Sequence, residues 1–249
     1  MKFTFITLFP DTIRAWLDCS IIGRAKAANL FEYETLQLRD FARGKHAPVD
    51  DVAYGGGGGM VLKVEPLAEA VDMVKAQSSL PVTVICFSPG GARLNQRLLD
   101  GMRSPDRRHY VLVCGHYEGI DQRFIDNWVD LEISIGDFVV SGGELPALLF
   151  ADSMIRGLEG SLGHPDGYRT ESFQLVDPKD GSTLIEYPHF TRPAEFRGHK
   201  VPAVLTSGDH GAVEKWRLEQ SRLRTKARGT KPIFDNAPSA SDTRPNGSV

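Results

Sequence analysis

Hydrophobic residues in the first two-thirds of the chain gather in short, continuous runs that alternate with amphipathic stretches. The runs cover residues 3–8, 82–87, 110–114 and 131–135. A strand that is apolar on both faces is typical of a parallel sheet covered by helices on both sides. The pattern therefore predicts an α/β domain in which these four strands form a parallel sheet.

The amphipathic stretches between the runs predict the helices that cover this sheet. They lie at residues 11–30, with a break near Gly23, and then at 65–74, 95–102, 120–129 and 145–158. Pro66 falls in the first turn of the second stretch, where a backbone N–H has no partner within the helix and its absence in proline costs nothing. Strands and helices thus alternate, as parallel pairing requires.

Composition divides the chain into four parts. Residues 1–160 form the α/β domain, and residues 161–180 are rich in Gly, Pro, Ser and Asp without periodicity, which predicts a flexible linker. Residues 181–234 predict a small, mostly helical domain, because the chain becomes helical and basic from about residue 183. Residues 235–249 have almost no apolar content, so we expect a disordered tail.

Basic residues are concentrated in the predicted C-terminal domain, although the formal net charge of the whole chain is −3. Asp209 is placed to cap a helix that starts at about Gly211. The basic residues of this segment are Lys215, Arg217, Arg222, Arg224, Lys226, Arg228 and Lys231. Such a run is either a solvated charged face or a surface that contacts phosphates.

Several protein classes are excluded by the sequence. Cys19, Cys86 and Cys114 are scattered and odd in number, so we expect no disulfide framework and no thiolate metal site; Cys86 and Cys114 sit in apolar runs as small buried hydrophobes. A signal peptide and a membrane-spanning stretch are both missing, which predicts a cytoplasmic protein without membrane contact. No P-loop is present, and no dinucleotide-binding glycine motif follows the first strand.

Glycine-rich loops follow three of the predicted strands, at residues 87–91, 115–119 and 135–143. Ligands of parallel sheets bind outside the carboxyl ends of the strands. Glycines there allow backbone N–H and C=O groups to approach a flat ligand such as an adenine ring. Each loop by itself is equally consistent with a tight turn, but three in succession favour a binding pocket.

A run of five glycines occupies residues 55–59, between Tyr54 and Met60. Ordering such a run costs much backbone entropy. The segment is either a flexible loop or a loop that passes close to a nucleic-acid backbone or a neighbouring subunit.

Five motifs together resemble the bacterial tRNA (guanine-N1)-methyltransferases, the TrmD family of the SPOUT class. They lie at residues 54–60, 114–121, 133–146, 187–193 and 207–210, the last followed by Trp216-Arg217. The segment 133–146, ISIGDFVVSGGELP, is the most specific, and the resemblance extends from residue 1 to about residue 232.

The resemblance implies a fold, a reaction and partners. Members of the family fold the C-terminal part of the first domain into a deep trefoil knot, a feature that is essentially absent from folds in general. They transfer a methyl group from S-adenosylmethionine to N1 of guanosine 37 of tRNA. They are homodimers whose active sites form at the subunit interface, and magnesium assists them, although no ligand cluster here predicts a metal site.

Specific residues are implied by the same alignment of motifs. The cofactor positions are Pro89, Gly115, Tyr117, Ile135, Gly136, Asp137, Phe138, Val139, Val140, Gly142, Gly143 and Pro146. The tRNA positions are His46, Asp50, Arg192, His210 and Arg217. Two departures from the family occur. His116 stands where the family commonly has Arg, which affects one polar contact near the cofactor, and Phe138 stands at a cofactor position where Tyr is frequent.

Methylation of guanine N1 requires a base that removes the N1 proton and a cation near O6. The family's Arg corresponds to Arg156, and its Asp corresponds to Glu171, which is one methylene longer. Asp166 and Asp177 in the same segment are the alternative bases. Since catalysis depends on placement at the ångström level, the substitution is a substantial departure.

Three other functions remain open at this stage. The first is a knotted methyltransferase that acts on another RNA position. The second is an RNA-binding protein that has lost catalysis, and the third is an adenine-nucleotide enzyme that does not act on RNA. The signatures of the C-terminal domain argue against the first. The intact glycine loops and Arg156 argue against the second, and the basic domain argues against the third.

Overall fold

The computed structural model describes residues 1–44, 46–103, 108–163 and 167–228. It divides the chain into two compact units, Met1–Pro165 and Asp166–Val249. Most of the segment expected to be a linker, residues 161–180, therefore belongs to the second unit. The expected disordered tail, residues 235–249, lies outside the described residues.

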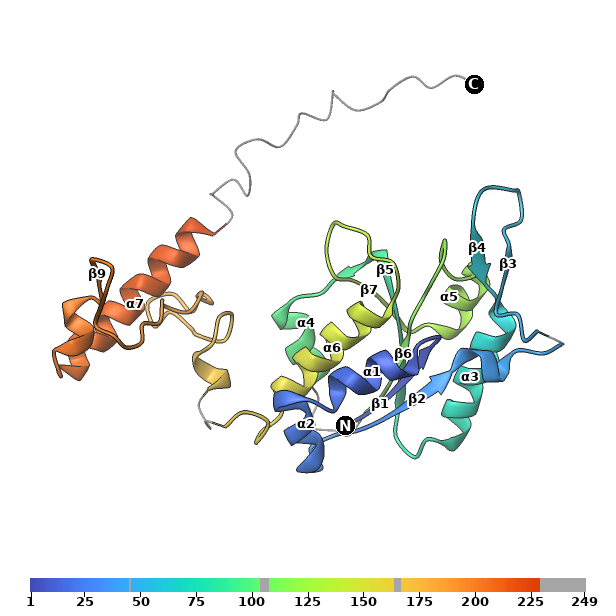
Figure 1. Ribbon diagram of the computed structural model, residues 1–249, viewed down its shortest axis with the longest axis horizontal. Coiled ribbons are helices and arrows are strands. Elements are labelled where there is room, and N and C mark those ends of the chain that lie inside the picture. The colour runs from blue at the N-terminus through green and yellow to red at the C-terminus, as the bar shows by residue number, and fades with distance from the viewer. Residues whose placement is uncertain (45, 104–107, 164–166, 229–249) are drawn as a thin grey trace, which may run out of the picture. The chain divides into compact units, whose positions relative to one another are not determined.

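A five-stranded parallel sheet forms the centre of the first unit (Figure 1). Four of its strands coincide with the predicted hydrophobic runs, and the fifth was not predicted. Its order is β2 (Glu32–Gln37), β1 (Lys2–Thr7), β6 (His109–Val113), β5 (Val82–Arg93) and β7 (Leu131–Ser134). Every residue of β6 is buried, because this strand lies between two others and under helices on both faces.

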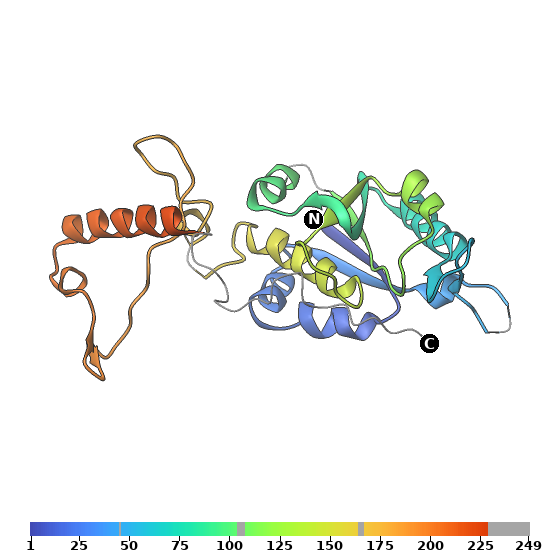
Figure 2. The ribbon, with the colours of Figure 1, turned by 90° about the horizontal axis from the view of Figure 1, so that it is seen from above.

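Alternate residues of the central strands supply two hydrophobic cores, one on each face of the sheet. Phe3 and Phe5 of β1 enter the first core, and Ile6 enters the second. The first core is covered by α1 (Pro10–Leu17), α2 (Ser20–Ala27), α4 (Gln96–Met102) and α6 (Glu144–Arg156), and the second by α3 (Val64–Gln77), α5 (Gln122–Trp128) and the 3-10 helix η1 (Leu38–Phe41). Figures 1 and 2 show α1, α2 and α6 together on one side of the sheet.

The predicted helix break near Gly23 is wrong by about four residues. The chain breaks at Asp18 and Cys19, and Gly23 lies inside α2. A Cβ atom at Gly23 would lie 2.5 Å from the carbonyl oxygen of Asp18. The glycine therefore allows the first turn of α2 to pack against the end of α1, rather than interrupting a helix.

Besides β2, two features of the first unit were not predicted. The strands β3 (Asp50–Val52) and β4 (Met60–Leu62) form an antiparallel hairpin, and the glycine run forms its tip. Strand β5 continues through the first glycine-rich loop, and its Phe87 and Ala92 both pair with Ile133, so residues 88–91 loop out beside β7.

The second unit is less helical than expected between residues 183 and 202. That stretch carries a short antiparallel pair, β8 (Glu195–Phe196) and β9 (His199–Lys200). The helical parts are η2 (Tyr168–Thr170), η3 (Ala203–Thr206) and α7 (His210–Ala227). Asp209 caps α7 as predicted, since its side chain accepts the N–H of Ala212 at 3.0 Å.

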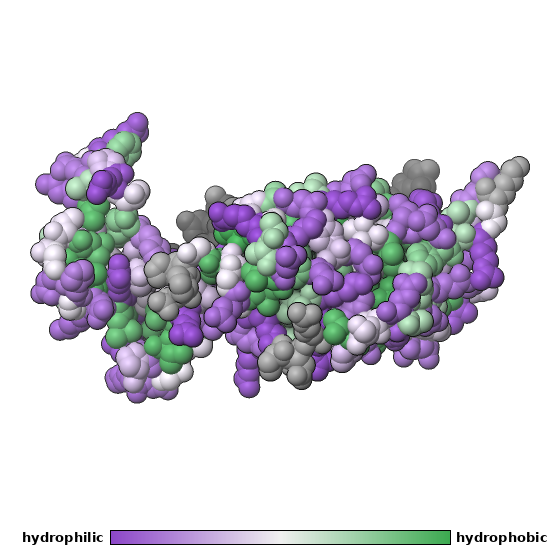
Figure 3. Space-filling view, turned by 90° about the horizontal axis from the view of Figure 1, so that it is seen from below, coloured by the Kyte–Doolittle hydropathy of each residue, from purple (hydrophilic) through white to green (hydrophobic). Residues whose placement is uncertain are grey.

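The molecular surface is mainly hydrophilic on the face that Figure 3 shows, with patches of hydrophobic residues among the polar ones. No described helix is long and apolar enough to cross a membrane.

Candidate active site

A cavity of about 450 Å³ lies at the carboxyl ends of β5, β6 and β7, beside the first turn of α6. This is the edge of a parallel sheet at which ligands bind. The volume is within the range of small-molecule sites. All three glycine-rich loops contribute to its wall, so the structure brings together segments that are up to 59 residues apart, from Phe87 to Pro146.

The residues implied for the cofactor lie almost entirely on this wall. The lining includes Pro89, Gly115, Tyr117, Ile135, Gly136, Phe138, Val139, Val140, Gly142, Gly143 and Pro146. Asp137 is the exception, because its side chain is 85% exposed and its Oδ2 pairs with Nη1 of Arg93 at 2.8 Å. Asp137 thus holds the loop after β7 through an ion pair outside the cavity.

Close backbone approach explains why the loop before α6 contains glycine. A Cβ atom at Gly143 would lie 2.6 Å from both Cα of Cys114 and the backbone nitrogen of Gly115. The N–H of Gly143 donates to the carbonyl oxygen of Gly115 at 2.8 Å. The loops after β6 and β7 are therefore in direct backbone contact at the cavity wall.

A polar chain that starts at His116 of the wall joins three segments. Nε2 of His116 lies 2.7 Å from Oε2 of Glu144, and the hydroxyl of Thr7 donates to Oε1 of the same carboxylate at 2.6 Å. Glu144 is only 6% exposed. Its place in the first turn of α6 favours a negative charge. Sequence reasoning missed Glu144 and Thr7, because the contact joins residues 137 positions apart.

The two cysteines near the cavity are not nucleophiles. Burial, and secondly the charge of Glu132, raises the pKa of the Cys86 thiol to about 12. Burial likewise raises the pKa of Cys114 well above its usual value, with a smaller contribution from Glu144. Both thiols are free and buried, which confirms the prediction that they serve as small hydrophobic side chains.

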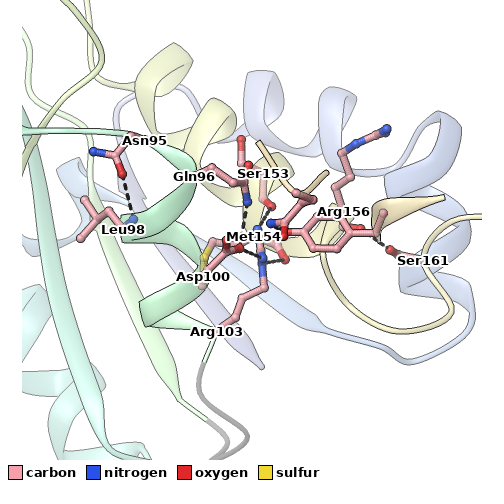
Figure 4. Close-up of polar contacts among 11 residues, drawn as sticks. Asn95, Gln96, Leu98, Asp100, Arg103, Ser153, Met154, Arg156 and Ser161 are labelled. Atoms are coloured by element: carbon pink, nitrogen blue, oxygen red, sulfur yellow. Dashed lines mark hydrogen bonds and ion pairs between the residues drawn. The ribbon is translucent and has the colours of Figure 1, made fainter. Parts of the chain in front are cut away.

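Arg156 is the last residue of α6 and does not line the large cavity. It lines a smaller hollow of about 180 Å³, together with Trp16 of α1 and Asp152. Figure 4 shows how this end of α6 is held: the guanidinium of Arg103 donates to the carbonyl oxygens of Met154 at 3.2 Å and of Ser153 at 2.9 Å. A cation at the C-terminal end of a helix is favourable.

The three candidate bases differ in how well their surroundings suit a general base. Glu171 directly follows η2, and its carbonyl oxygen accepts the N–H of Leu175 at 2.9 Å. Asp177 is bound by Arg222, which lowers the pKa of Asp177 to about 2, with help from the N–H of Lys179. So acidic a carboxylate is a poor base near neutral pH. Asp166 lies outside the described residues.

The residues implied for tRNA lie in both units. His46 is exposed, and Asp50 is the first residue of β3. The β3–β4 hairpin is tied to the cavity, because Met60 accepts the N–H of Glu118 at 3.0 Å. In the second unit Arg192, His210 and Arg217 are all exposed, and the guanidinium of Arg217 lies over a tyrosine ring, that of Tyr187, at 4.8 Å.

The first unit and most of the second match one protein family. The family described as tRNA (Guanine-1)-methyltransferase TrmD matches residues 1–232. The chain belongs to this family. The TrmD relative of Brevibacillus brevis, named tRNA (guanine-N(1)-)-methyltransferase, is 45% identical over 92% of this chain and 89% of its own length. The relative of the same name from Synechococcus elongatus is 46% identical over 92% of each chain.

A solved structure supports the same assignment. The crystal structure of tRNA (m1G37) methyltransferase from Aquifex aeolicus is 36% identical, with a TM-score of 0.72 over 91% of both chains. The resemblance seen in the motifs is thereby confirmed, as is the parallel α/β fold of the SPOUT class with a helical C-terminal part. A methyltransferase of the TrmD family uses S-adenosylmethionine as its methyl donor. Among the described residues no group of three His, Cys, Asp or Glu side chains is suited to a metal ion.

Proposed function

We propose that this protein transfers a methyl group from S-adenosylmethionine to N1 of guanosine 37 of tRNA, beside the anticodon. The observation that carries the proposal is the cavity of about 450 Å³ at the carboxyl ends of three parallel strands, in a chain of the TrmD family. When bound, S-adenosylmethionine supplies an electrophilic methyl group. The trefoil knot of the family is part of the proposal.

The cavity suits this methyl donor for a chemical reason. Its wall combines apolar side chains, such as Ile135, Val140 and Pro146, with the backbone groups of Gly115 and Gly142. Apolar contacts suit the adenine ring, and backbone N–H and C=O groups provide hydrogen bonds to its edge. His116 is also part of this wall, and its contact with Glu144 joins the loop after β6 to the first turn of α6.

Glu171 removes the N1 proton of the guanine in this proposal, and Arg156 stabilises the negative charge that develops near O6. The N1 lone pair becomes available to accept the methyl group only when that proton leaves. The usual Asp is one methylene shorter than Glu171. We therefore infer that the turn around Glu171 compensates for the length of its side chain.

A homodimer is the second part of the proposal, and an exposed apolar face supports it. Leu145 and Leu149 lie on one side of α6 and are 62% and 47% exposed, and the neighbouring Trp16 of α1 is 52% exposed. Helical spacing places Arg156 on the same side of α6 as these leucines. If a second copy covers this face, Arg156 lies at the interface and is available to the partner's cavity.

Size-exclusion chromatography with light scattering tests the dimer. We expect twice the mass of the 249-residue chain and a shift to the single-chain mass in Leu149→Glu, since a buried charge is costly. Phe196→Glu is the control, because Phe196 is also exposed but lies in the second unit. A wild-type protein with the mass of one chain would refute the dimer.

Methyl transfer from labelled S-adenosylmethionine to defined tRNA transcripts tests the reaction. One transcript carries guanosines at positions 36 and 37, and the other carries adenosine at 37. We expect label only on the first transcript, at N1. Label at another position would favour a different knotted methyltransferase. Absence of label with tRNA and cofactor binding intact would favour an RNA-binding protein without catalysis.

The base assignment has its own test. Glu171→Gln should abolish turnover and leave the affinity for S-adenosylmethionine nearly unchanged, since the amide cannot accept the proton. Glu159→Gln is a matched control, because Glu159 is an exposed carboxylate of the neighbouring segment. Full activity of Glu171→Gln would end the assignment.

A further inference from the structure

Arg222 of α7 forms a bidentate ion pair with a buried carboxylate, although its own side chain is 42% exposed. Its Nε donates to Oδ2 of Asp177 at 2.7 Å, and its Nη2 donates to Oδ1 at 2.6 Å. Asp177 is only 5% exposed. A bidentate pair of this kind fixes both orientation and distance. Arg222 is therefore engaged within the protein, although its sequence position groups it with the candidate phosphate contacts.

Asp177 belongs to a hydrogen-bonded turn that begins at Glu171. The N–H of Phe173 donates to the carbonyl oxygen of Leu184 at 2.8 Å, and the N–H of Leu184 donates to Leu175 at 2.8 Å. The N–H of Asp177 closes the turn by donating to Ser182 at 2.8 Å. We name residues 171–185 the base turn. The carboxylate of the proposed base is thus attached to an ordered element.

Two further contacts tie the base turn to α7. The hydroxyl of Thr225 accepts the N–H of Ile185 at 2.8 Å, and the guanidinium of Arg228 lies 4.7 Å from the centre of the Phe173 ring. Together with Arg222, Thr225 of α7 and Arg228, the residue directly after α7, contact the turn. The base turn and α7 therefore form one packed body within the second unit.

We propose that Arg222 is a positioning residue that clamps the base turn to α7, so that Glu171 moves into place together with the helix that docks on tRNA. The inference rests on the proposed function. It assigns different tasks to arginines on one helix: Arg222, paired with Asp177, orients the catalytic segment, whereas Arg224 contacts phosphate.

Single-turnover methylation with saturating tRNA and S-adenosylmethionine tests the clamp. We expect Arg222→Met to lower the rate about 10- to 100-fold, because a misplacement of about 1 Å at a reacting group has effects of this size. Its Kd for tRNA should stay within twofold, and the slope of log Kd against log salt should not change. Arg224→Met is the contrast and should weaken tRNA binding and reduce that slope by about one.

Rescue variants separate positioning from a loss of folding. Arg222→Lys keeps the charge but not the bidentate geometry, so its rate should lie between those of the wild type and Arg222→Met. The charge swap Asp177→Arg with Arg222→Asp should recover a rate above that of either single variant. The helical signal in circular dichroism, to which α7 contributes, shows whether the second unit remains folded.

The outcomes are distinct. A wild-type rate in Arg222→Met, or a loss confined to tRNA affinity and salt slope, would overturn the clamp while leaving the proposed function intact. If Arg222→Met has a weaker helical signal than the wild type, absence of rescue by the charge swap would also overturn the clamp. A wild-type protein that methylates no tRNA would instead reject the proposed function.

Discussion

The contact at Gly143 predicts that a single methyl group added there will disrupt the cofactor cavity. In Gly143→Ala the new Cβ atom would lie 2.6 Å from two backbone atoms, Cα of Cys114 and the nitrogen of Gly115. Neither atom is the flexible end of a side chain, so the two loops must separate. Gly143 has φ −78°, which alanine adopts readily, so backbone conformation by itself does not oppose the substitution.

The expected magnitude follows from the groups that move. Overpacking a well-packed site costs about 1–3 kcal/mol, and loss of the hydrogen bond from Gly143 to Gly115 costs about 1 kcal/mol more. If the whole cost of about 2–4 kcal/mol falls on the bound state, the affinity for S-adenosylmethionine drops by about 30- to 700-fold. Any part that falls on folding appears as a lower free energy of unfolding.

Isothermal titration with S-adenosylmethionine and urea unfolding, made on the same preparations, measure both parts. Gly101→Ala in α4 is the matched control, since a Cβ atom at Gly101 meets nothing within 4 Å. Alanine there should leave the affinity unchanged and stabilise the helix by up to about 1 kcal/mol. If Gly143→Ala keeps both the affinity and the free energy of unfolding of the wild type, the two loops do not form the wall of the cofactor site.

Three further predictions concern the first unit and the clamp. His116→Ala leaves the carboxylate of Glu144 buried without its imidazole partner, so we expect weaker binding of S-adenosylmethionine in calorimetry and a partial recovery in His116→Arg. The pKa of Asp177 is lowered to about 2, against 3.8 for an ordinary Asp. The stabilising contribution of this carboxylate is therefore complete above about pH 4 and is lost as the pH falls towards 2. In Asp177→Asn, the melting temperature should change less between pH 4 and pH 2 than it does in the wild type. Gly23→Ala should lower the melting temperature, because its Cβ atom would lie 2.5 Å from the carbonyl oxygen of Asp18.

The sheet was predictable to the extent that its strands are buried on both faces. Strands β1, β5, β6 and β7 consist largely of apolar residues and were expected. Strand β2, with the sequence EYETLQ, is an edge strand and only half-buried, so its polar residues conceal it. Strands β3 and β4 have three residues each and show no periodicity. Pattern reasoning thus detects the apolar strands, including the edge strand β7, and misses a polar edge strand and short hairpins.

The cofactor site was predictable because its chemistry is local. Each glycine-rich loop directly follows a strand, and parallel strands present their carboxyl ends at one edge, so adjacency in space follows from adjacency in sequence. The pair of His116 and Glu144 is different, because only the fold brings the two residues together with Thr7. The sequence contains no signal for a contact that depends on three separate segments.

The case of Arg222 shows why charge patterns alone do not assign function. In the sequence Arg222 and Arg224 are indistinguishable members of one basic run. The difference between them is Asp177, which lies 45 residues before Arg222 and is buried against it. An arginine whose donors are already used by a carboxylate has fewer to offer a phosphate, and breaking the pair would leave a buried charge behind. Fewer side chains of α7 can therefore contact phosphates than the net charge of the helix indicates. If so, tRNA affinity depends on arginines such as Arg224, whereas the rate of methyl transfer depends on Arg222, which pairs with Asp177.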